Sequence, residues 1–449
     1  MVERAVLLAE VERRLGPRRL VWAGLRGDDT EPLADLPQLA ASFAIAGAYA
    51  MRGRLQTVAY EDLTGVRVDP EIWDIDDHLR DEPTLEFRHE LLRALNGSIA
   101  LLPYRPSQFL SAAFFARRGE SSINLGISGA QQAAFEHKPW VEVGIKKLDI
   151  PQIPWVYIAD QDQLKARQLA GADGKSIVLR KSRTSGGEGF THLATFDDLV
   201  GAWPTVNEAF VSVAPFIDGA LPVNVGATVW KDGVTVHHPS VQLIGIDSCV
   251  TREFGYCGND FGAASSLSPG AVDQIEVSTT RIGSWLRDHG YRGSFGVDYL
   301  VKDSVPLFTE VNPRFQGSTH ASCRLSIEAG EACLMLEHVA AWLDISCPKD
   351  CASLRTRVRE TPDLVNLVVH WTGETRSQTD ALALVDHLSV IERSTRADLV
   401  TPDGVLNDCG SAVVRLMMRR RVTETGYDLD PSLEAIIGQW RVAQEGPKG

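Results

Sequence analysis

The sequence has little basic charge and no long apolar run. Its 449 residues hold 45 lysines and arginines against 59 aspartates and glutamates, which gives a net charge of −14 at pH 7. This balance disfavours nucleic acids and anionic membranes as partners, because both bind basic surfaces. No segment is apolar over the length of a membrane span, and no N-terminal stretch has the pattern of a signal peptide. We therefore expect a cytoplasmic protein that acts on small molecules.

Cysteine is also scarce, and several well-known motifs are missing. The seven cysteines are odd in number and scattered, so they favour reduced core thiols over a disulfide framework. No G-x-G-x-x-G closes a strand and opens a helix, which argues against a dinucleotide fold. Gly174-Lys175-Ser176 lacks the first glycine of a P-loop and precedes a strand where that motif needs a helix. No G-x-S-x-G motif supplies a nucleophilic serine.

What is present indicates a multidomain protein of α/β and α+β structure. The chain is too long for one ordinary core, and its 44% hydrophobic and 23% charged content is typical of a globular protein. In the first segment, apolar runs at residues 19–24 and 57–60 alternate with helix-like stretches at residues 36–51 and 84–95. This alternation predicts an open α/β unit.

Polar stretches and prolines mark the expected domain boundaries. We predict an N-terminal α/β domain at residues 1–137, a central domain at residues 138–345 and a C-terminal α+β domain at residues 346–449. The last of these has expected strands near residues 364–371 and 412–418. The sequence leaves open whether this C-terminal domain caps a pocket or builds a homodimer.

Residues 293–319, GSFGVDYLVKDSVPLFTEVNPRFQGST, carry the strongest chemical signal. They predict a hairpin with a polar turn near Ser304, which places Asp298 opposite Glu310 and puts Asn312 on the same face. Two facing carboxylates repel each other unless a cation offsets their charge. Mg²⁺ fits, because it is commonly held by one or two carboxylates together with the phosphates of a nucleotide. Two Mg²⁺ ions would fit if Glu310 bridges them, and Mn²⁺ is an alternative.

The competing interpretation is an exposed hairpin whose acids face water. Arg314 and Gly317 argue against it, because a guanidinium can bind a phosphate or carboxylate and a glycine permits close approach of a ligand. The pattern G-x-D followed by E-x-N-x-R resembles the metal-binding end of the ATP-grasp superfamily of carboxylate–amine ligases. The resemblance covers roughly residues 138–335. It implies an ATP-grasp fold, with ATP between two α+β subdomains and a smaller open α/β (pre-ATP-grasp) domain before them.

A glycine-rich loop at residues 183–189, RTSGGEG, lies between expected strands at residues 176–180 and 190–194. Backbone N–H groups in such a loop can form a concavity that binds anions, once side chains are out of the way. Three glycines alone would also fit a flexible hairpin, but their position upstream of the acidic hairpin favours a binding loop. The resemblance assigns the ATP phosphates to Ser185, Gly186, Gly187 and Gly189.

The resemblance implies further ATP contacts. Lys138 would reach the α-phosphate. A second lysine of the family falls at Arg180, with Lys181 beside it, which leaves open which of these cations faces ATP. The adenine hinge falls around Ala214 and Phe216, whose backbone groups would contact the base. Ala214 replaces the family's usual glutamate, so the ribose contact is also left open.

The implied reaction has two steps. A carboxylate attacks the γ-phosphate of ATP, and an amine then displaces phosphate from the acyl phosphate, giving a peptide or other amide, ADP and phosphate. The substrates would be small carboxylates and amines, amino acids or peptides among them. Arg314 would contact the transferred phosphate or the substrate carboxylate, and the candidates for the acyl pocket are Arg252, Ser318 and His320. Two alternatives stay open: a small-molecule kinase with the same metal site, and a catalytically degenerate nucleotide-binding protein.

Overall fold

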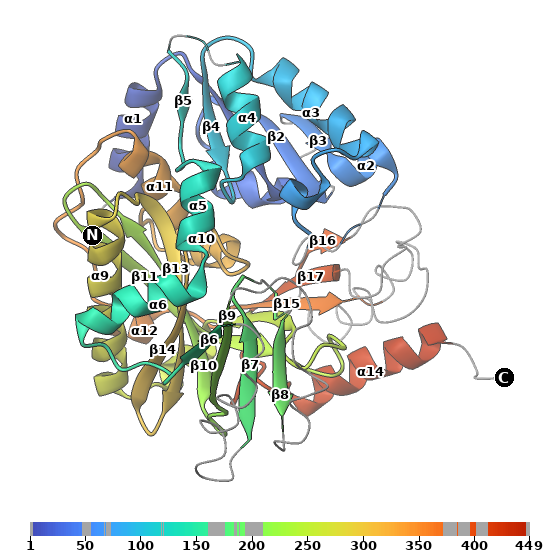
Figure 1. The fold of residues 1–449 in the computed structure, drawn as a ribbon, viewed down its shortest axis with the longest axis vertical. Coiled ribbons are helices and arrows are strands. Elements are labelled where there is room, and N and C mark those ends of the chain that lie inside the picture. The colour runs from blue at the N-terminus through green and yellow to red at the C-terminus, as the bar shows by residue number, and fades with distance from the viewer. Residues whose placement is uncertain are drawn as a thin grey trace.

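The structure is a computed structural model, and its described residues form three β-sheets surrounded by helices (Figure 1). Within the part of the chain that is described, no helix is both long and apolar enough to cross a membrane. The described residues are 3–46, 55–66, 68, 73–117, 119, 121–159, 176–183, 186–187, 189–193, 210–370, 384, 396–400 and 412–445.

The N-terminal unit is a parallel five-stranded sheet with the strand order β3-β2-β1-β4-β5. The strands are β1 (Arg19–Arg26), β2 (Leu39–Ala46), β3 (Gln56–Ala59), β4 (Ile99–Pro103) and β5 (Ile123–Asn124). The helices of this unit are α1 (Arg4–Leu15), η1 (Gly27–Leu33), α2 (Tyr60–Thr64), η2 (Ile75–His78), α3 (Glu82–Ala94), α4 (Gln108–Arg117) and α5 (Gly129–Phe135). Trp22 shares a core with α1, whereas its neighbour Val21 shares one with α3 and α4. The sheet is therefore covered on both faces, and the predicted open α/β unit is confirmed.

One local prediction for this unit is wrong. The apolar pattern of residues 36–51 predicts a helix, but residues 39–46 form strand β2. Most of β2 is buried, and its sequence LAASFAIA is small and apolar on both faces of the sheet, so it shows no strand alternation. Residues 47–51 lie outside the described residues.

The largest sheet is antiparallel and has the order β14-β13-β10-β11-β12-β15-β17-β16. Its strands are β10 (Leu221–Val229), β11 (Val234–Ile244), β12 (Tyr256–Asp260), β13 (Gly293–Lys302), β14 (Val305–Asn312), β15 (Val365–His370), β16 (Arg396–Val400) and β17 (Ala412–Met418). The helices around it are η4 (Gly262–Ser266), α9 (Pro269–Asp288), α10 (Thr319–Glu328), α11 (Leu334–Trp342), α12 (Leu354–Glu360) and α14 (Pro431–Glu445). Along β10, Val223 and Val225 pack in one core with α9, so the intervening Asn224 faces the other side.

A third sheet of four antiparallel strands lies beside the largest one (Figure 1). Its order is β6-β9-β7-β8, with β6 (Val156–Ala159), β7 (Ile177–Lys181), β8 (Phe190–Leu193) and β9 (Phe210–Pro215). Helix α6 (Lys138–Ile145) and the turn η3 (Lys146–Leu148) lead into it. The predicted hairpin around the glycine-rich loop is confirmed, because Arg180 pairs with Phe190.

The mixed α/β and α+β architecture agrees with the fold class expected from the sequence. The largest sheet crosses the expected boundary at residues 345–346, because β12 pairs with β15. Strands before and after that boundary therefore share one sheet. The division of the chain into three domains stays a prediction.

Candidate active site

The β13–β14 hairpin brings two carboxylates together through a β-bulge. Its two-residue turn has positive φ at both Asp303 (51°) and Ser304 (64°), and the strands pair in a regular register next to this turn. Continued without a break, that register would pair Asp298 with Thr309. A bulge at Thr309 shifts the pairing by one residue, so Asp298 lies opposite Glu310. The predicted pairing of the two acids is confirmed, and the bulge is its cause.

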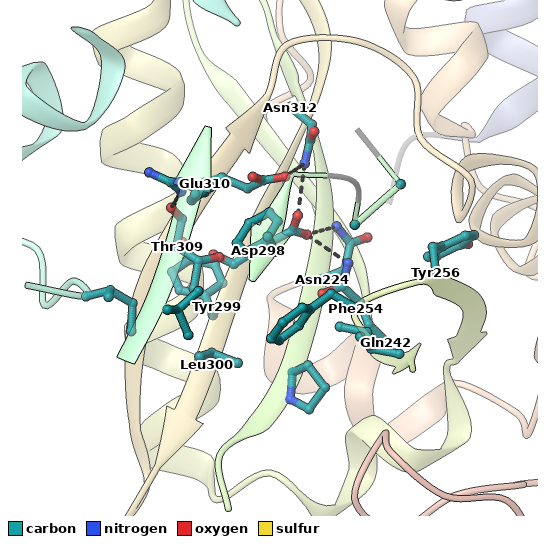
Figure 2. A pocket seen from close by; sticks show the side chains of 18 of the residues that line it. Asn224, Gln242, Phe254, Tyr256, Asp298, Tyr299, Leu300, Thr309, Glu310 and Asn312 are labelled. Carbon is teal, nitrogen blue, oxygen red and sulfur yellow. Dashed lines mark hydrogen bonds between the residues drawn. The ribbon is translucent and has the colours of Figure 1, made fainter. Parts of the chain in front are cut away.

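Three amide side chains surround the Asp298 carboxylate (Figure 2). Asn224 donates from Nδ2 to Oδ1 at 2.6 Å, and Asn312 donates from Nδ2 to Oδ2 at 2.9 Å. Gln242 donates from Nε2 to Oδ1 at 3.3 Å. Asn224 is fixed in turn by Ser318, whose hydroxyl donates to Asn224 Oδ1 at 2.9 Å. Side chains from β10, β11 and β14 thus converge on one carboxylate of β13.

Cations gather around Glu310. Lys138, at the first position of α6, places Nζ 3.3 Å from Glu310 Oε2. Burial acts to raise the pKa of Glu310, but the charges of Lys138, Arg180 and Arg314 outweigh burial and hold this pKa below its usual value. Burial, together with the charge of Glu310, raises the pKa of Asp298 to about 7. The protein groups alone therefore favour the charged form of Glu310 but not that of Asp298.

This pair of acids has the chemistry of a divalent-cation site. A cation would offset the charge that burial and Glu310 make unfavourable at Asp298, and Asn312 brings an amide oxygen as a further ligand. No cluster of three or more His, Cys, Asp or Glu side chains suited to a metal ion occurs among the described residues. Mg²⁺ fits such an incomplete ligand set, because it keeps waters and takes phosphate oxygens as ligands.

The acids lie in a cleft of about 240 Å³ between the four-stranded and the eight-stranded sheet. The apolar side chains that line it are Ile153, Trp155, Val178, Phe190, Pro215, Phe216, Ile217, Pro222, Ile244, Phe254 and Leu300. The polar side chains beside the acids are Asn224, Gln242, Asn259, Asn312, Arg314, Gln316 and Ser318. An apolar slot joined to a charged end suits a ligand with a flat apolar part and an anionic part.

Nearly all of the cleft is formed by residues between 145 and 318, and this segment matches the protein-family model described as ATP-grasp domain. The chain contains an ATP-grasp domain. Its predicted resemblance to this superfamily is therefore confirmed.

Two curated proteins are similar to part of this chain. The formate-dependent phosphoribosylglycinamide formyltransferase of Dechloromonas aromatica (strain RCB) is 26% identical over 180 residues, which cover 38% of this chain and 42% of that protein. The acetyl-CoA carboxylase of Dictyostelium discoideum is 25% identical over 152 residues, which cover 34% of this chain and 6% of that protein. This chain therefore spans less than half the length of each relative.

Solved structures resemble almost the whole chain. Carboxyaminoimidazole ribonucleotide synthase from Aspergillus clavatus, complexed with ATP, has a TM-score of 0.62 at 12% identity and covers 95% of this chain and 100% of its own. The biotin carboxylase domain of Hydrogenobacter thermophilus 2-oxoglutarate carboxylase, complexed with MgADP, ADP and bicarbonate, has a TM-score of 0.62 at 12% identity. It covers 96% of this chain and 95% of its own. At this identity the likeness establishes the shared fold.

The ATP-grasp domain turns Arg180, and not Lys181, toward the cleft. Arg180 lines the cleft together with Val178, two residues before it on β7. Lys181 follows the alternation of Ile177 and Leu179, whose side chains pack in a separate core on the opposite face. Of the two candidate cations, Arg180 is therefore the one that lines the cleft, and its contact with ATP stays a prediction.

Two residues of the glycine-rich loop line the cleft. Gly186 and Gly187 line it, and φ is positive at both (59° and 79°) and at Gly189 (73°). A Cβ atom on Gly187 would lie 1.8 Å from the backbone oxygen of Phe254, so only glycine fits there. Ser185, which is also predicted to bind ATP, lies outside the described residues.

The expected adenine hinge lies at the apolar end of the cleft. Phe216 lines the cleft, whereas Ala214 is buried beneath it and pairs with Val178. The N–H of Phe216 donates to the backbone oxygen of Ser176 at 2.9 Å, so this donor is already used within the protein. The ring of Phe216 stacks on His192 with 4.2 Å between ring centroids.

The three candidates for the acyl pocket lie in different places. Ser318 lines the cleft and fixes Asn224. His320 does not line it: this side chain is buried on α10 and faces the N-terminal unit, with Nε2 3.1 Å from Glu31 Oε2. Arg252 lies in the loop between β11 and β12 and is also not part of the lining.

Several residues of the cleft are missing from the sequence-based prediction. They are Asn224, Gln242, Tyr256, Asn259, Gln316 and Tyr427. Asn224 has a usable signal, because it is the one strongly polar residue in the strand LPVNVGATV. Tyr427 has none, because it reaches the cleft only through the docking of the chain before α14, where Gly426 O accepts from Ile244 N at 2.8 Å.

Proposed function

We propose that this protein is an ATP- and Mg²⁺-dependent ligase that activates a small carboxylate as an acyl phosphate and joins it to an amine. The observation that carries the proposal is the partly buried pair of Asp298 and Glu310 at the charged end of a cleft whose other end is apolar. Such a cleft suits a nucleotide, with its base in the apolar slot and its phosphates near the acids.

We propose that Asp298, Glu310 and Asn312 hold Mg²⁺, or two ions if Glu310 bridges them. When bound, Mg²⁺ would offset the negative charge on the transferring phosphate oxygens. Lys138 is already within ion-pair distance of Glu310, at 3.3 Å, and so lies where the phosphate chain would pass. Arg180 and the N–H groups of the glycine-rich loop would bind the same chain of phosphates.

Arg314 has the best position for a catalytic role. It lines the cleft next to Asn312, to whose Oδ1 it donates from Nη2 at 3.4 Å, and its Nε lies 3.9 Å from Glu136 Oε1. A guanidinium there would bind the transferred phosphoryl group or the substrate carboxylate and would stabilise charge in both steps. The reaction needs no protein nucleophile, because the substrate carboxylate and the amine attack directly.

The proposed substrates are limited to small carboxylates and amines. The named relatives include a formate-dependent enzyme, and the structural neighbours include complexes with bicarbonate and with 5-aminoimidazole ribonucleotide. None of these names points to amino acids or peptides, which the sequence resemblance suggests. A first panel therefore combines formate, bicarbonate and other small acids with small primary amines, and it retains amino acids as a separate group.

The test is to measure ADP and phosphate release for each acid–amine pair with and without Mg²⁺, with mass spectrometry of the same mixtures. The proposal predicts release that depends on Mg²⁺ and is strongest when both substrates are present, together with a condensation product. A stable phosphorylated product without condensation would favour a kinase. ATP turnover that is equal with every carboxylate offered would contradict a ligase.

A further inference from the structure

The Arg180 side chain is unusually buried for a residue that lines a ligand-binding cleft. Its side chain and that of Glu142 are each only 1% exposed, and Arg180 Nη2 lies 2.6 Å from Glu142 Oε1. The guanidinium is stacked over the ring of Trp155, with its Cζ 3.9 Å from the ring centroid, and Nη1 donates to Thr309 O at 3.5 Å. Arg180 Nε is buried and has no hydrogen-bond partner among the described residues. Of the five N–H groups of this guanidinium, the one on Nε is thus unsatisfied within the described residues, in a side chain that lines the cleft.

Glu142 is fixed from its other side. Tyr157 donates its hydroxyl hydrogen to Glu142 Oε2 at 2.6 Å, so both carboxylate oxygens are engaged. Glu142 lies one turn after Lys138 on α6, and Lys138 contacts Glu310. One short helix therefore contacts two residues that line the cleft: Lys138 pairs with Glu310, and Glu142 holds Arg180.

Stability is a weak explanation for this buried ion pair. Removing two charges from water costs several kcal/mol for each ion, and apolar residues of similar size often serve stability equally well. Burial raises the pKa of Glu142 even though Arg180 lies beside it, so the desolvation is not fully compensated. A role in holding Arg180 in a fixed orientation explains why a carboxylate is present.

We propose that Glu142 is a positioning residue for the polyphosphate of the nucleotide. It holds the Arg180 guanidinium in one orientation, and Tyr157 in turn holds Glu142, so that an N–H group of Arg180 that Glu142 does not use can donate to a phosphate oxygen. This inference rests on the proposed function, because it takes ATP as the ligand of the cleft. It also fits an arginine where the family usually has lysine, because the rigid planar fork presents N–H groups on more than one edge and so can bind Glu142 and a phosphate at once.

The test is a double-mutant cycle for Mg²⁺-ATP binding, measured by isothermal titration calorimetry on the full chain. The variants are Glu142→Gln, Arg180→Lys and the double variant. We expect each single substitution to weaken ATP binding about tenfold, equivalent to about 1.4 kcal/mol. The double variant should be no weaker than about tenfold, because both changes break the same contact.

Glu337→Gln is the matched control. Glu337 is also buried and also accepts hydrogen bonds within the protein, from Thr235 and with Oε2 3.0 Å from His237 Nε2, but it does not line the cleft. Glu337→Gln should bind ATP as the wild type does, even if its unfolding midpoint falls. If Glu142→Gln does not fold, Tyr157→Phe takes its place, with a smaller loss of ATP affinity in the same direction.

The outcomes separate the two claims. Three results would overturn the positioning role while ATP binding by the wild type stands. Glu142→Gln could bind ATP with wild-type affinity, the losses of ATP affinity could multiply in the double variant, or Glu337→Gln could lose as much ATP affinity as Glu142→Gln. Absence of ATP binding by the wild-type protein would instead overturn the proposed function, and this inference with it. In the fallback variant, unchanged ATP affinity of Tyr157→Phe would count against the role of Glu142.

Discussion

The hydroxyl of Thr309 donates to the backbone oxygen of Asp298 at 2.8 Å, across the bulge that brings Glu310 opposite Asp298. Thr309 is the extra residue of β14 at this point, and its own backbone oxygen accepts from Arg180. The bulge therefore joins three features of the cleft: the pair of acids, the hairpin that carries them and the four-stranded sheet on the other side.

The first prediction concerns the proposed metal ligand Asp298. Asp298→Asn should lower Mg²⁺-dependent ADP release by about 100-fold or more, since metal-ion catalysis supplies several kcal/mol of transition-state stabilisation. The free energy of unfolding should change little, because the substitution removes one of two facing negative charges. Asp303→Asn, in the exposed turn of the same hairpin, is the control and should retain activity. Full activity of Asp298→Asn would refute its role as a ligand.

A second prediction concerns the amide that holds Asp298. Asn224→Ala removes the 2.6 Å hydrogen bond to Asp298 and the partner of Ser318. The Mg²⁺ concentration needed for half-maximal ADP release should rise by about 10- to 100-fold, as for other residues that orient metal ligands. Asn259→Ala is the control, because Asn259 lines the cleft but donates to Ser240 at 2.9 Å. An equal shift in both variants would argue against a specific role for Asn224.

The third prediction concerns the glycine-rich loop. Gly187→Ala should destabilise this loop by about 1–3 kcal/mol, because positive φ and the approach to Phe254 both oppose a Cβ atom. ATP affinity should fall as the loop moves away from the cleft. Gly330→Ala is a matched control: Gly330 also has positive φ (72°), but a Cβ atom would meet nothing within 4 Å. Equal ATP affinity in the two variants would show that the loop does not bind the nucleotide.

The fourth prediction concerns a buried ion cluster between the N-terminal unit and β17. Arg415 is 2% exposed and donates to Asp28 at 2.7 Å and to Asp29 at 2.9 Å. Arg415→Ala should lower the free energy of unfolding by about 3–5 kcal/mol, because it leaves two carboxylates buried without their cation. Urea denaturation measures this loss.

The control for that cluster is Arg419→Ala. Arg419 pairs with Glu328 at the surface, where both side chains are exposed, so the loss should stay below about 1 kcal/mol. A loss of the same size in both variants would mean that Arg415 contributes no more than a surface pair.

Much of the acidic end of the cleft could be predicted because it lies in one hairpin. Strand alternation and a turn suffice to place Asp298, Glu310 and Asn312 together. The turn is centred between Asp303 and Ser304, half a residue before the expected centre, and the bulge at Thr309 restores the expected pairing of Asp298 with Glu310. The choice between Arg180 and Lys181 follows from the same alternation once the apolar partners of β7 are known.

Other features depend on packing between distant segments. Residues 39–46 form a buried parallel strand, whose uniform apolar sequence cannot be distinguished from a helix by its period. Ser318 lines the cleft, but His320 follows it by two residues at the start of a helix, which turns the side chain by roughly 200° and away from Ser318. Tyr427 lies far from the hairpin in sequence, and no local pattern links the two.

The most direct test of the ligase claim follows oxygen from the carboxylate. Once an acid–amine pair is identified, the acid is labelled with ¹⁸O in its carboxylate and the phosphate released from ATP is examined by mass spectrometry. An acyl phosphate intermediate predicts that one ¹⁸O atom appears in the phosphate, because the carboxylate oxygen that attacks the γ-phosphate leaves with it when the amine attacks the acyl carbon. Phosphate that carries no ¹⁸O, formed together with the amide product, would contradict an acyl phosphate intermediate.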